Sequence, residues 1–403
     1  MILKVGQSLA SAVDGTTLVV LRPAEGDVTL TCGGVQMSEG KTTSGDGTSI
    51  DAAHIGGALI GKRYVDEASG LEVLCTKPGQ GSSRWAALCS CSRGPHRCPL
   101  RTECSGPNEE WSLRMNISML LDMAVDGFGD RVVIGTRDTG ITASRLRELA
   151  IAGAATVRDS GADAIVYLAV NGPAFPVAMF AAARAGVPLV PVNYRLGREQ
   201  LDALLANHPR ALGIADPNQA EVLERAGLNV RTPAQWLQQL SEPDVTKVDE
   251  DEGLDTEGAA VVIYTSGTTS APKGVLLRHE NLSSYVIGSV EFANAEDADA
   301  ALVSVPPYHI AAVANVITNL YAGRRTMVLE QFTPEQWLDT VRDEGITNAL
   351  VVPTMLARIV DSDADKTVPA LRGLAYGERL CPPGLSSVRW NCGPRSDSSM
   401  PTV

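Results

Sequence analysis

The chain of 403 residues is poor in positive charge and has no long uninterrupted apolar run. Its 34 Lys and Arg residues stand against 47 Asp and Glu, and the formal net charge is −13. An acidic surface repels a phosphate backbone, so this balance argues against general nucleic-acid binding. The longest segment without a charge, residues 164–183, contains Asn171, Gly172, Pro173 and Pro176. Such breaks do not suit a transmembrane segment, and we expect a strand, a turn and a helix instead.

Two further patterns are absent. Residues 1–12 hold one lysine but no apolar stretch long enough for a secretory signal, so we expect a cytoplasmic protein. Four of the eight cysteines crowd into residues 89–104 with the spacing C-x-C-x6-C-x5-C, which matches no standard zinc pattern, and we predict no metal site. Cys32 and Cys75 each end a strand-like run. They read as small buried side chains, while a disulfide or a shared metal stays open as an alternative.

Composition changes along the chain predict separate parts, and the length allows about two to three domains. Residues 1–81 carry short strand-like runs joined by glycine-rich turns, which indicates a small β-rich unit. Residues 82–114 are rich in Ser, Arg, Cys and Pro without any period and read as an irregular linker. Residues 115–380 form the largest part, and residues 381–403 form an irregular tail. No function follows for the first unit.

From residue 115 onward, strand-like and helix-like segments alternate. Strands are expected near residues 130–134, 164–170, 188–193, 211–215, 259–263, 302–305, 326–329 and 349–352. Helices are expected near residues 117–124, 142–150, 174–185, 198–207, 218–226, 276–292, 311–320 and 333–338, with Thr142 and Thr333 as hydroxyl caps. This alternation predicts an α/β fold with mainly parallel sheets flanked by helices.

The most informative stretch runs from Tyr264 to Val275 and reads YTSGTTSAPKGV. It follows the apolar run Ala259–Ile263, which reads as a buried strand, and precedes Leu276–Phe292, which has helical spacing. Backbone N–H groups and small hydroxyls in such a loop can donate to phosphate oxygens, and the glycines allow close approach. Lys273 adds a positive charge. The stretch therefore predicts a phosphate-binding loop.

Two other readings of this loop fit less well. A hydrophilic turn does not require so many Thr, Ser and Gly residues together with a lysine. The nucleotide loop G-x-x-x-x-G-K-[ST] also fits badly. Pro272 precedes Lys273 where the second glycine is required, and Gly274 follows it where Ser or Thr is required.

The loop resembles the signature T-S-G-T-T-G-x-P-K-G of AMP-forming acyl-adenylate ligases, the superfamily of acyl-CoA synthetases and luciferases. Nine of the ten positions agree, and Ser270 replaces the usual glycine. Upstream, Ala185–Arg195 fits the pattern A-G-x-x-x-V-P-x-N-x-R of the same family. The resemblance covers about residues 115–380 and implies an acyl-CoA synthetase-like N-terminal domain that is incomplete.

The resemblance also implies roles for single residues. The residues implied in binding ATP are Thr265, Ser266, Gly267, Thr268, Thr269, Lys273, Gly274 and Gly377. Among these, Lys273 and Thr268 are implied in catalysis. Tyr308 and His309 match a P-x-[FY]-H segment, and Pro353 and Thr354 match a V-P-T segment, both beside the acyl site. Without the resemblance, a lone histidine at a strand end would more often be structural.

In this family a carboxylate attacks the α-phosphate of ATP to give acyl-AMP and pyrophosphate, and a thiol then takes the acyl group. The resemblance therefore implies ATP, Mg²⁺, a small-molecule carboxylic acid, and coenzyme A or another thiol carrier as partners. The apolar residues 311–320 favour a fatty or other apolar acid. An amino-acid-activating variant fits less well, because no fixed charge for an α-amino group stands among them.

Glu378 stands where the family has a second glycine, and the resemblance ends near it. We find no Y-G-x-T-E motif and no counterpart of the C-terminal domain with its lysine. We therefore expect a fused and truncated gene product with impaired turnover. The alternative is a non-catalytic remnant that at most binds ATP or AMP weakly.

Overall fold

The computed structural model describes residues 3–24, 28–40, 55–66, 69–81, 115–241, 255–265 and 273–376. Its internal contacts divide the chain into two compact units. One comprises Met1–Met115 with Ser283–Ile287, and the other comprises Asn116–Leu282 with Gly288–Val403. The expected linker and tail, residues 82–114 and 381–403, lie outside the described ranges.

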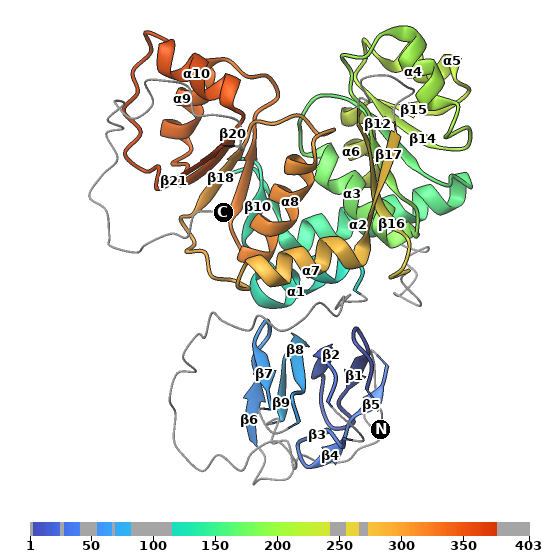
Figure 1. Ribbon diagram of the computed structural model, residues 1–403, viewed down its shortest axis with the longest axis vertical. Coiled ribbons are helices and arrows are strands. Elements are labelled where there is room, and N and C mark those ends of the chain that lie inside the picture. Colours follow the sequence, from blue (N-terminus) through green and yellow to red (C-terminus); the bar gives the residue numbers. More distant parts are fainter. Residues whose placement is uncertain are drawn as a thin grey trace. The chain divides into compact units, whose positions relative to one another are not determined.

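The first unit is β-rich, as predicted, and its main sheet has the order β5-β1-β2-β8-β7 with antiparallel neighbours (Figure 1). Its strands are β1 (Ser8–Ala10), β2 (Thr17–Arg22), β5 (Ser38–Glu39), β7 (Arg63–Val65) and β8 (Glu72–Lys77). Two small antiparallel pairs accompany it, namely β3 (Thr31–Cys32) with β4 (Val35–Gln36), and β6 (Ile55–Ala58) with β9 (Gly79–Gly81). Leu18, Val20 and Val73 contribute to its core.

Cys32 and Cys75 are both fully buried in this core, and both are free thiols, so the disulfide left open by the sequence is not formed. Burial raises the pKa of the Cys75 thiol to about 12 and also raises that of Cys32. A thiol that stays protonated at neutral pH is a weak nucleophile. The two cysteines therefore behave as small apolar side chains.

The second unit contains two six-stranded sheets, and this α/β architecture confirms the predicted fold class. One sheet has the order β15-β14-β12-β13-β16-β17, and the other has the order β11-β10-β19-β18-β20-β21 (Figure 1). Every neighbour pair is parallel except β16–β17 and β10–β11. The carboxyl ends of the parallel strands therefore meet at one edge of each sheet, where α/β proteins place their ligands.

The strands of the first of these sheets are β12 (Ile165–Leu168), β13 (Leu189–Pro191), β14 (Leu212–Ala215), β15 (Asn229–Arg231), β16 (Ala259–Thr265) and β17 (Lys273–Arg278). Those of the second are β10 (Val132–Ile134), β11 (Ile141–Thr142), β18 (Ala300–Val303), β19 (Arg325–Val328), β20 (Asn348–Val351) and β21 (Gly373–Tyr376). Strands β12, β13, β14 and β18 are buried at every position. Such continuous apolar strands are typical of a sheet covered on both faces.

The helices of the second unit are α1 (Ser118–Phe128), α2 (Ala143–Ser160), α3 (Ala174–Ala185), α4 (Arg198–Leu205), α5 (Ala220–Arg225), α6 (Pro233–Ser241), α8 (Ile310–Ala322), α9 (Pro334–Asp343) and α10 (Pro353–Asp361). Helix α7 (His279–Ser289) begins and ends in this unit, while its residues Ser283–Ile287 are grouped with the first. Both predicted caps are present. Thr142 accepts a hydrogen bond from the N–H of Arg145, and Thr333 accepts one from the N–H of Gln336. The donor–acceptor distance is 3.1 Å in both bonds. These bonds satisfy donors that the first helical turn leaves free.

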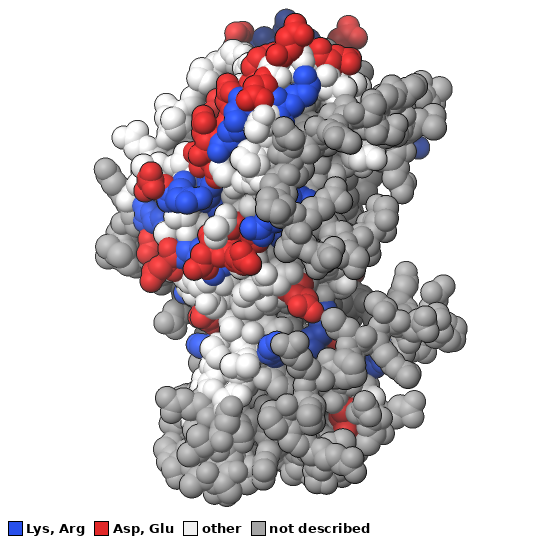
Figure 2. All heavy atoms as spheres, turned by 90° about the vertical axis from the view of Figure 1, so that its left-hand side faces the viewer, with Lys and Arg blue, Asp and Glu red and all other residues white. Residues whose placement is uncertain are grey.

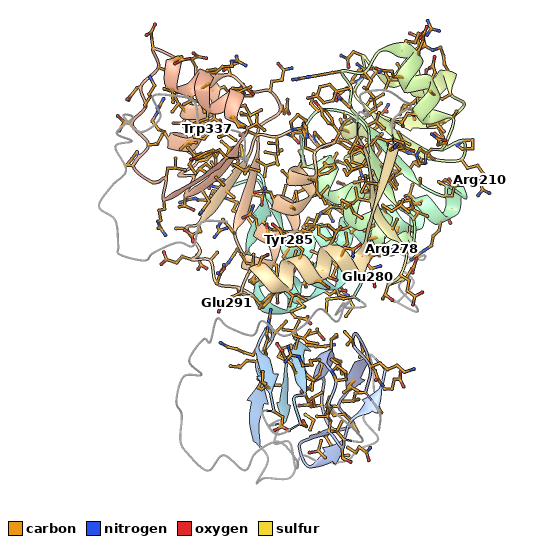
Figure 3. The ribbon with its side chains drawn as sticks, viewed as in Figure 1. Arg210, Arg278, Glu280, Tyr285, Glu291 and Trp337 are labelled. Carbon is orange, nitrogen blue, oxygen red and sulfur yellow. The ribbon has the colours of Figure 1, made fainter. Side chains whose placement is uncertain are left out.

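Each sheet of the second unit has its own apolar core. One includes Val166, Val190 and Leu204, and the other includes Leu302, Leu338 and Trp337, the fully buried side chain of α9 labelled in Figure 3. Outside the cores, oppositely charged side chains pair, as Arg145 does with Glu148 over 2.7 Å. Figure 2 shows such acidic and basic side chains interleaved over part of one face. No helix in the described ranges is long and apolar enough to cross a membrane.

The predicted helix over residues 276–292 is wrong at its start. Residues Lys273–Arg278 form strand β17, and the helix, α7, begins at His279. Val275, Leu276 and Leu277 pair with Ile263, Val262 and Val261 of β16. A short apolar run fits a strand or a helix equally well, and here the pairing with β16 decides.

A buried polar cluster fixes the start of α7. The His279 ring is 1% exposed, and its Nδ1 accepts a hydrogen bond from the N–H of Ile117 over 3.3 Å. Beside it, the Asn116 amide donates to the carbonyls of Ala183 (3.1 Å) and Asp255 (2.6 Å). Burial lowers the pKa of His279 to about 4, although the Asp255 charge opposes this shift. The imidazole is therefore neutral at physiological pH.

We expect this histidine to make the fold acid-sensitive. Its folded pKa lies below its unfolded value of about 6.5, so the unfolded chain takes up the proton first. The stabilisation is complete above pH 6.5 and is lost as the pH falls towards 4, with a loss of ~2 kcal/mol near pH 5. Urea unfolding near pH 7 and near pH 5 measures this loss. In a His279→Gln variant the pH difference should shrink by that amount, and an unchanged difference would contradict the assignment.

Candidate functional site

The ends of the predicted phosphate loop are held together by an antiparallel hairpin. Thr265 at the end of β16 is opposite Lys273 at the start of β17, and Tyr264 is opposite Gly274. The Thr265 hydroxyl donates to the carbonyl of Lys273 over 3.5 Å, and Lys273 is exposed. Ser266, Gly267, Thr268 and Thr269 lie between these ends, outside the described residues, so their roles stay predictions. The hairpin delivers both ends of the loop to one place, beyond the carboxyl end of β16.

Gly274 packs closely against the facing strand β16. A Cβ atom at this position would lie 3.3 Å from a methyl group of Val262 and 3.5 Å from the Tyr264 ring. The Tyr264 hydroxyl in turn lies 2.9 Å from Nε2 of His208, and the two rings meet edge to face. Close packing under Gly274 and the hydrogen bond to His208 therefore anchor the strand that carries Thr265 and Lys273.

Two predicted site residues, Tyr308 and His309, lie at the carboxyl edge of the sheets beside Tyr194 and Arg195, which were not predicted as site residues. Tyr308 and His309 follow β18, and Tyr194 and Arg195 follow β13 of the other sheet. The rings of Tyr194 and Tyr308 meet edge to face with centroids 5.3 Å apart, and the Tyr308 and His309 rings are 4.9 Å apart. The Arg195 guanidinium lies 5.9 Å from the Tyr194 ring centroid. We name Tyr194, Arg195, Tyr308 and His309 the edge cluster.

The edge cluster has a defined electrostatic character. Desolvation by the surrounding protein lowers the pKa of His309, and the positive charge of Arg195 lowers it further. Burial raises the pKa of Tyr308, and the neighbouring Tyr194 adds to this effect. At neutral pH the cluster therefore presents the neutral imidazole of His309 and the protonated phenol of Tyr308 beside the guanidinium of Arg195. Such a set can accept a proton from a ligand or donate hydrogen bonds to an anionic one.

For Pro353, Thr354 and Gly377, the remaining predicted residues, the structure describes no hydrogen bond or ring contact with the edge cluster. Pro353 and Thr354 form the first turn of α10, directly after β20, which is the parallel neighbour of β18. They therefore lie at the same edge of the sheet as Tyr308 and His309. Gly377 falls beyond the last described residue. Within the described ranges, no hydrogen bond or ring contact joins the hairpin end to the Tyr308–His309 pair.

One buried residue at this edge, Asn171, was not predicted as a site residue. Asn171, in the turn between β12 and α3, is 5% exposed and donates to the carbonyls of Val305 (2.8 Å) and Leu329 (3.3 Å). Its partners follow β18 and β19 of the other sheet. An Asn-Gly-Pro run reads as an ordinary turn, and backbone acceptors so distant in the chain leave no local pattern that could be found.

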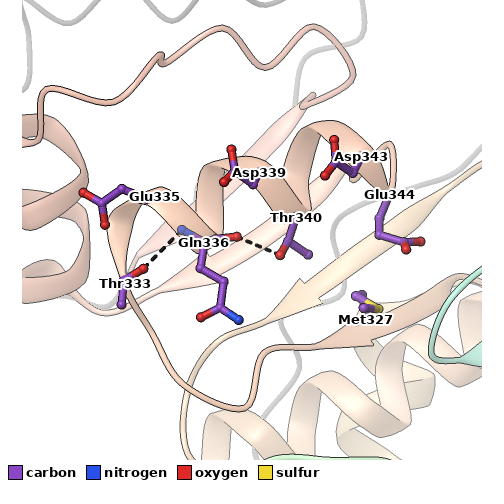
Figure 4. A pocket seen from close by; sticks show the side chains of 8 residues that line it. All are labelled: Met327, Thr333, Glu335, Gln336, Asp339, Thr340, Asp343 and Glu344. Atoms are coloured by element: carbon purple, nitrogen blue, oxygen red, sulfur yellow. Dashed lines mark hydrogen bonds between the residues drawn. The ribbon is translucent and has the colours of Figure 1, made fainter.

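A pocket of about 430 Å³ lies along α9, and Figure 4 shows its lining. Met327 lies at one side, and the carboxylates of Glu335, Asp339, Asp343 and Glu344 dominate the rest. Asp339 pairs with Arg342, and Glu344 pairs with Arg325 over 2.7 Å. Acidic side chains at this density repel the phosphates of a nucleotide. The pocket is therefore unsuited to a triphosphate, in contrast to the hairpin end at Lys273.

Comparison with known proteins agrees with the fold and with the motif. The sequence profile of the family described as AMP-binding enzyme matches residues 121–395, which is more than half of the chain. The chain therefore belongs to the family of AMP-binding enzymes, and the predicted resemblance to AMP-forming ligases is confirmed. The match continues to residue 395, past the point near Glu378 where the motif resemblance ends.

Curated relatives are acid-activating ligases. The chain is 33% identical to a feruloyl-CoA synthase of Amycolatopsis sp over 230 residues, which is 56% of this chain and 46% of the relative. It is 28% identical to a mitochondrial malonate–CoA ligase of Bos taurus over 300 residues, covering 70% of this chain and 49% of the relative. The chain thus spans about half the length of the curated relatives it matches.

Solved structures show the same fold. The N-terminal domain of FACL13 from Mycobacterium tuberculosis superposes with a TM-score of 0.59 at 22% identity, covering 67% of this chain and 71% of that one. ATP-bound MatB from Rhodopseudomonas palustris superposes with a TM-score of 0.54 at 24% identity, covering 65% of this chain and 55% of that one. Because the sequence identities are below 25%, the superpositions support the fold and nothing further.

Proposed function

We propose that this chain carries the ATP-binding part of an acid–CoA ligase that activates a carboxylic acid as its adenylate. The observation that carries the proposal is the β16–β17 hairpin. It joins Thr265 to Lys273 across a loop that matches the family's phosphate signature, in a chain that belongs to the AMP-binding family. The relatives support the same chemistry, since a feruloyl-CoA synthase and an indoleacetate–CoA ligase both join an acid to coenzyme A.

In the proposed reaction, the acid carboxylate attacks the α-phosphate of ATP, acyl-AMP forms, and pyrophosphate leaves. Thr265, Ser266, Thr268, Thr269, Lys273 and the backbone at Gly267 and Gly274 would hold the β- and γ-phosphates. Lys273 and Thr268 would also stabilise the charge that develops on the leaving pyrophosphate, because positioned donors act most strongly in the transition state. Gly377 would pack against the adenine.

Magnesium would arrive as the complex with ATP. The described residues contain no group of three His, Cys, Asp or Glu side chains that could hold a metal ion. When bound, Mg²⁺ supplies charge neutralisation on the phosphates. We propose that the protein's own contribution is Lys273 and the hydroxyl-rich loop. A cytoplasmic location, where ATP and coenzyme A are available, is part of the same proposal.

The acid would bind at the edge cluster. Tyr308 and His309 would border the reacting carboxyl group, and Pro353 and Thr354 would lie beside the acyl chain. Helix α8 follows His309 and is mainly apolar, with Ala312, Val313 and Val316 buried. This supports an acid with an apolar body, either a fatty or an aryl acid. Coenzyme A or another thiol carrier would then take the acyl group.

ATP–pyrophosphate exchange with a panel of acids tests the proposal. The panel should include a medium-chain fatty acid, a hydroxycinnamic acid, an aryl acetic acid and malonate, and each should be assayed with and without Mg²⁺. Exchange that depends on one class of acid supports the proposed ligase. Binding of Mg·ATP without exchange supports the non-catalytic alternative. Absence of both would overturn the proposal.

A further inference from the structure

Asn171 joins the two sheets of the second unit at the edge where the acid is proposed to bind. It follows β12 in one sheet, and its side-chain amide donates to carbonyls that follow β18 and β19 in the other. Asn171 is 5% exposed and the two acceptor residues, Val305 and Leu329, are themselves buried, so little water can replace the amide as a donor. Removing the amide would leave buried acceptors unsatisfied, which is costly.

The backbone that presents Asn171 is itself held on both sides. The Tyr167 hydroxyl donates to the carbonyl of Val170 over 3.1 Å, and the N–H of Val170 donates to the Asp216 carboxylate over 2.8 Å. Burial raises the pKa of Tyr167, so its hydroxyl stays protonated and remains a donor. Val170 is therefore held by hydrogen bonds to Tyr167 of β12 and to Asp216, which follows β14. These bonds fix the backbone next to Asn171.

The acceptor at Val305 is the last anchor before the edge cluster. Pro306 and Pro307 come next, and proline has no N–H with which to bind a neighbouring segment. The carbonyl of Pro306 accepts a hydrogen bond from the N–H of His309 over 3.0 Å, which closes a tight turn. The position of Tyr308 and His309 therefore depends on where the carbonyl of Val305 is held.

We propose that Asn171 is a positioning residue for the acid site. It holds the segment that begins at Val305, so that His309 and Tyr308 of one sheet face Tyr194 and Arg195 of the other. It touches neither ATP nor the acid. The expected effect on acid binding rests on the proposed acid-activating function. The expected effect on the position of His309 does not.

Asn171→Ala tests the inference, with Asn116→Ala as a matched control. Asn116 is also buried and also donates to two backbone carbonyls, but these belong to Ala183 in α3 and to Asp255, which precedes β16, rather than to the segment before the edge cluster. Asn116 also accepts from the N–H and the hydroxyl of Ser118, so Asn116→Ala should lose at least as much stability as Asn171→Ala. An NMR titration measures the pKa of His309, and the signal that disappears in His309→Gln identifies its resonance. In Asn171→Ala this pKa should rise towards the usual value for histidine. In Asn116→Ala it should stay as in the parent protein.

The binding readout separates positioning from folding. Asn171→Ala should weaken the affinity for the acid by roughly 10-fold, because two hydrogen bonds to a buried segment are lost. The affinity for Mg·ATP should stay within a factor of about 2 of the parent value. Asn171→Leu, which has nearly the same shape but no donor and no charge, should weaken the affinity for the acid to a similar extent and serves if the alanine variant does not fold. A His309 pKa that stays at the parent value in both variants would overturn the inference. If the parent protein binds neither acid nor ATP, the proposed function fails, yet the His309 comparison still decides the placement.

Discussion

Replacing Lys273 with methionine is expected to weaken Mg·ATP binding by about 10- to 150-fold, because a hydrogen bond between charged groups contributes about 1.5–3 kcal/mol. Lys273 is exposed at the end of the hairpin, opposite Thr265, so its ammonium is presented beyond the carboxyl end of β16. Methionine keeps most of the side-chain length but removes the charge. Isothermal titration with Mg·ATP measures the dissociation constant directly.

Two controls belong to this experiment. Lys273→Arg retains a positive charge and should lose less affinity than the methionine variant. Lys366→Met removes a lysine of the same unit that donates to the carbonyl of Ser362, after α10, and should leave the dissociation constant unchanged. Equal affinities for the parent protein and Lys273→Met would mean that the hairpin end does not bind the triphosphate.

Replacing Trp337 with alanine is expected to lower the free energy of unfolding by about 3–5 kcal/mol. Its indole is fully buried in α9, in the core that also contains Leu302 of β18 and Val351 of β20. Those two strands lead into Tyr308–His309 and into Pro353–Thr354. The loss would therefore fall on the sheet that carries the proposed acid site. Thermal or urea unfolding followed by circular dichroism measures it.

The adjacent residue provides the control for this prediction. Gln336 is exposed on the same helix, and Gln336→Ala should change the free energy of unfolding by less than about 0.5 kcal/mol. The phenyl ring of Trp337→Phe fills part of the same space. The free energy of unfolding of this variant should therefore lie between those of Trp337→Ala and Gln336→Ala. A Trp337→Ala variant as stable as Gln336→Ala would show that the core of this sheet does not depend on the indole.

Much of the second unit was predictable because its strands and helices differ strongly in pattern. The predicted helix 174–185 coincides with α3, and the capping threonines Thr142 and Thr333 marked the starts of α2 and α9. The signature of the phosphate loop could be recognised because its residues are contiguous and their chemistry is local, while its binding role stays a prediction. Local sequence is sufficient where one segment alone determines the structure.

Structure that depends on distant partners was not predictable. Val275–Leu277 reads as the start of a helix, and only its pairing with β16 makes it a strand. Asn171 reads as a turn residue, because its acceptors lie 134 and 158 positions further along the chain. Tyr308 was predicted from a family pattern, whereas Tyr194 occupies an unspecified position of its pattern, and the contact between their rings depends on how two sheets meet. In each case the deciding interaction is tertiary, and the sequence displays only one partner.

Hydrogen–deuterium exchange of the unaltered chain, with and without Mg·ATP, tests the central claim most directly. If the hairpin end binds the triphosphate, peptides covering Ala259–Arg278 should exchange more slowly with the nucleotide, while peptides covering Pro334–Asp343 beside the acidic pocket should not change. Protection confined to the acidic pocket, or no protection anywhere at saturating Mg·ATP, would contradict the account.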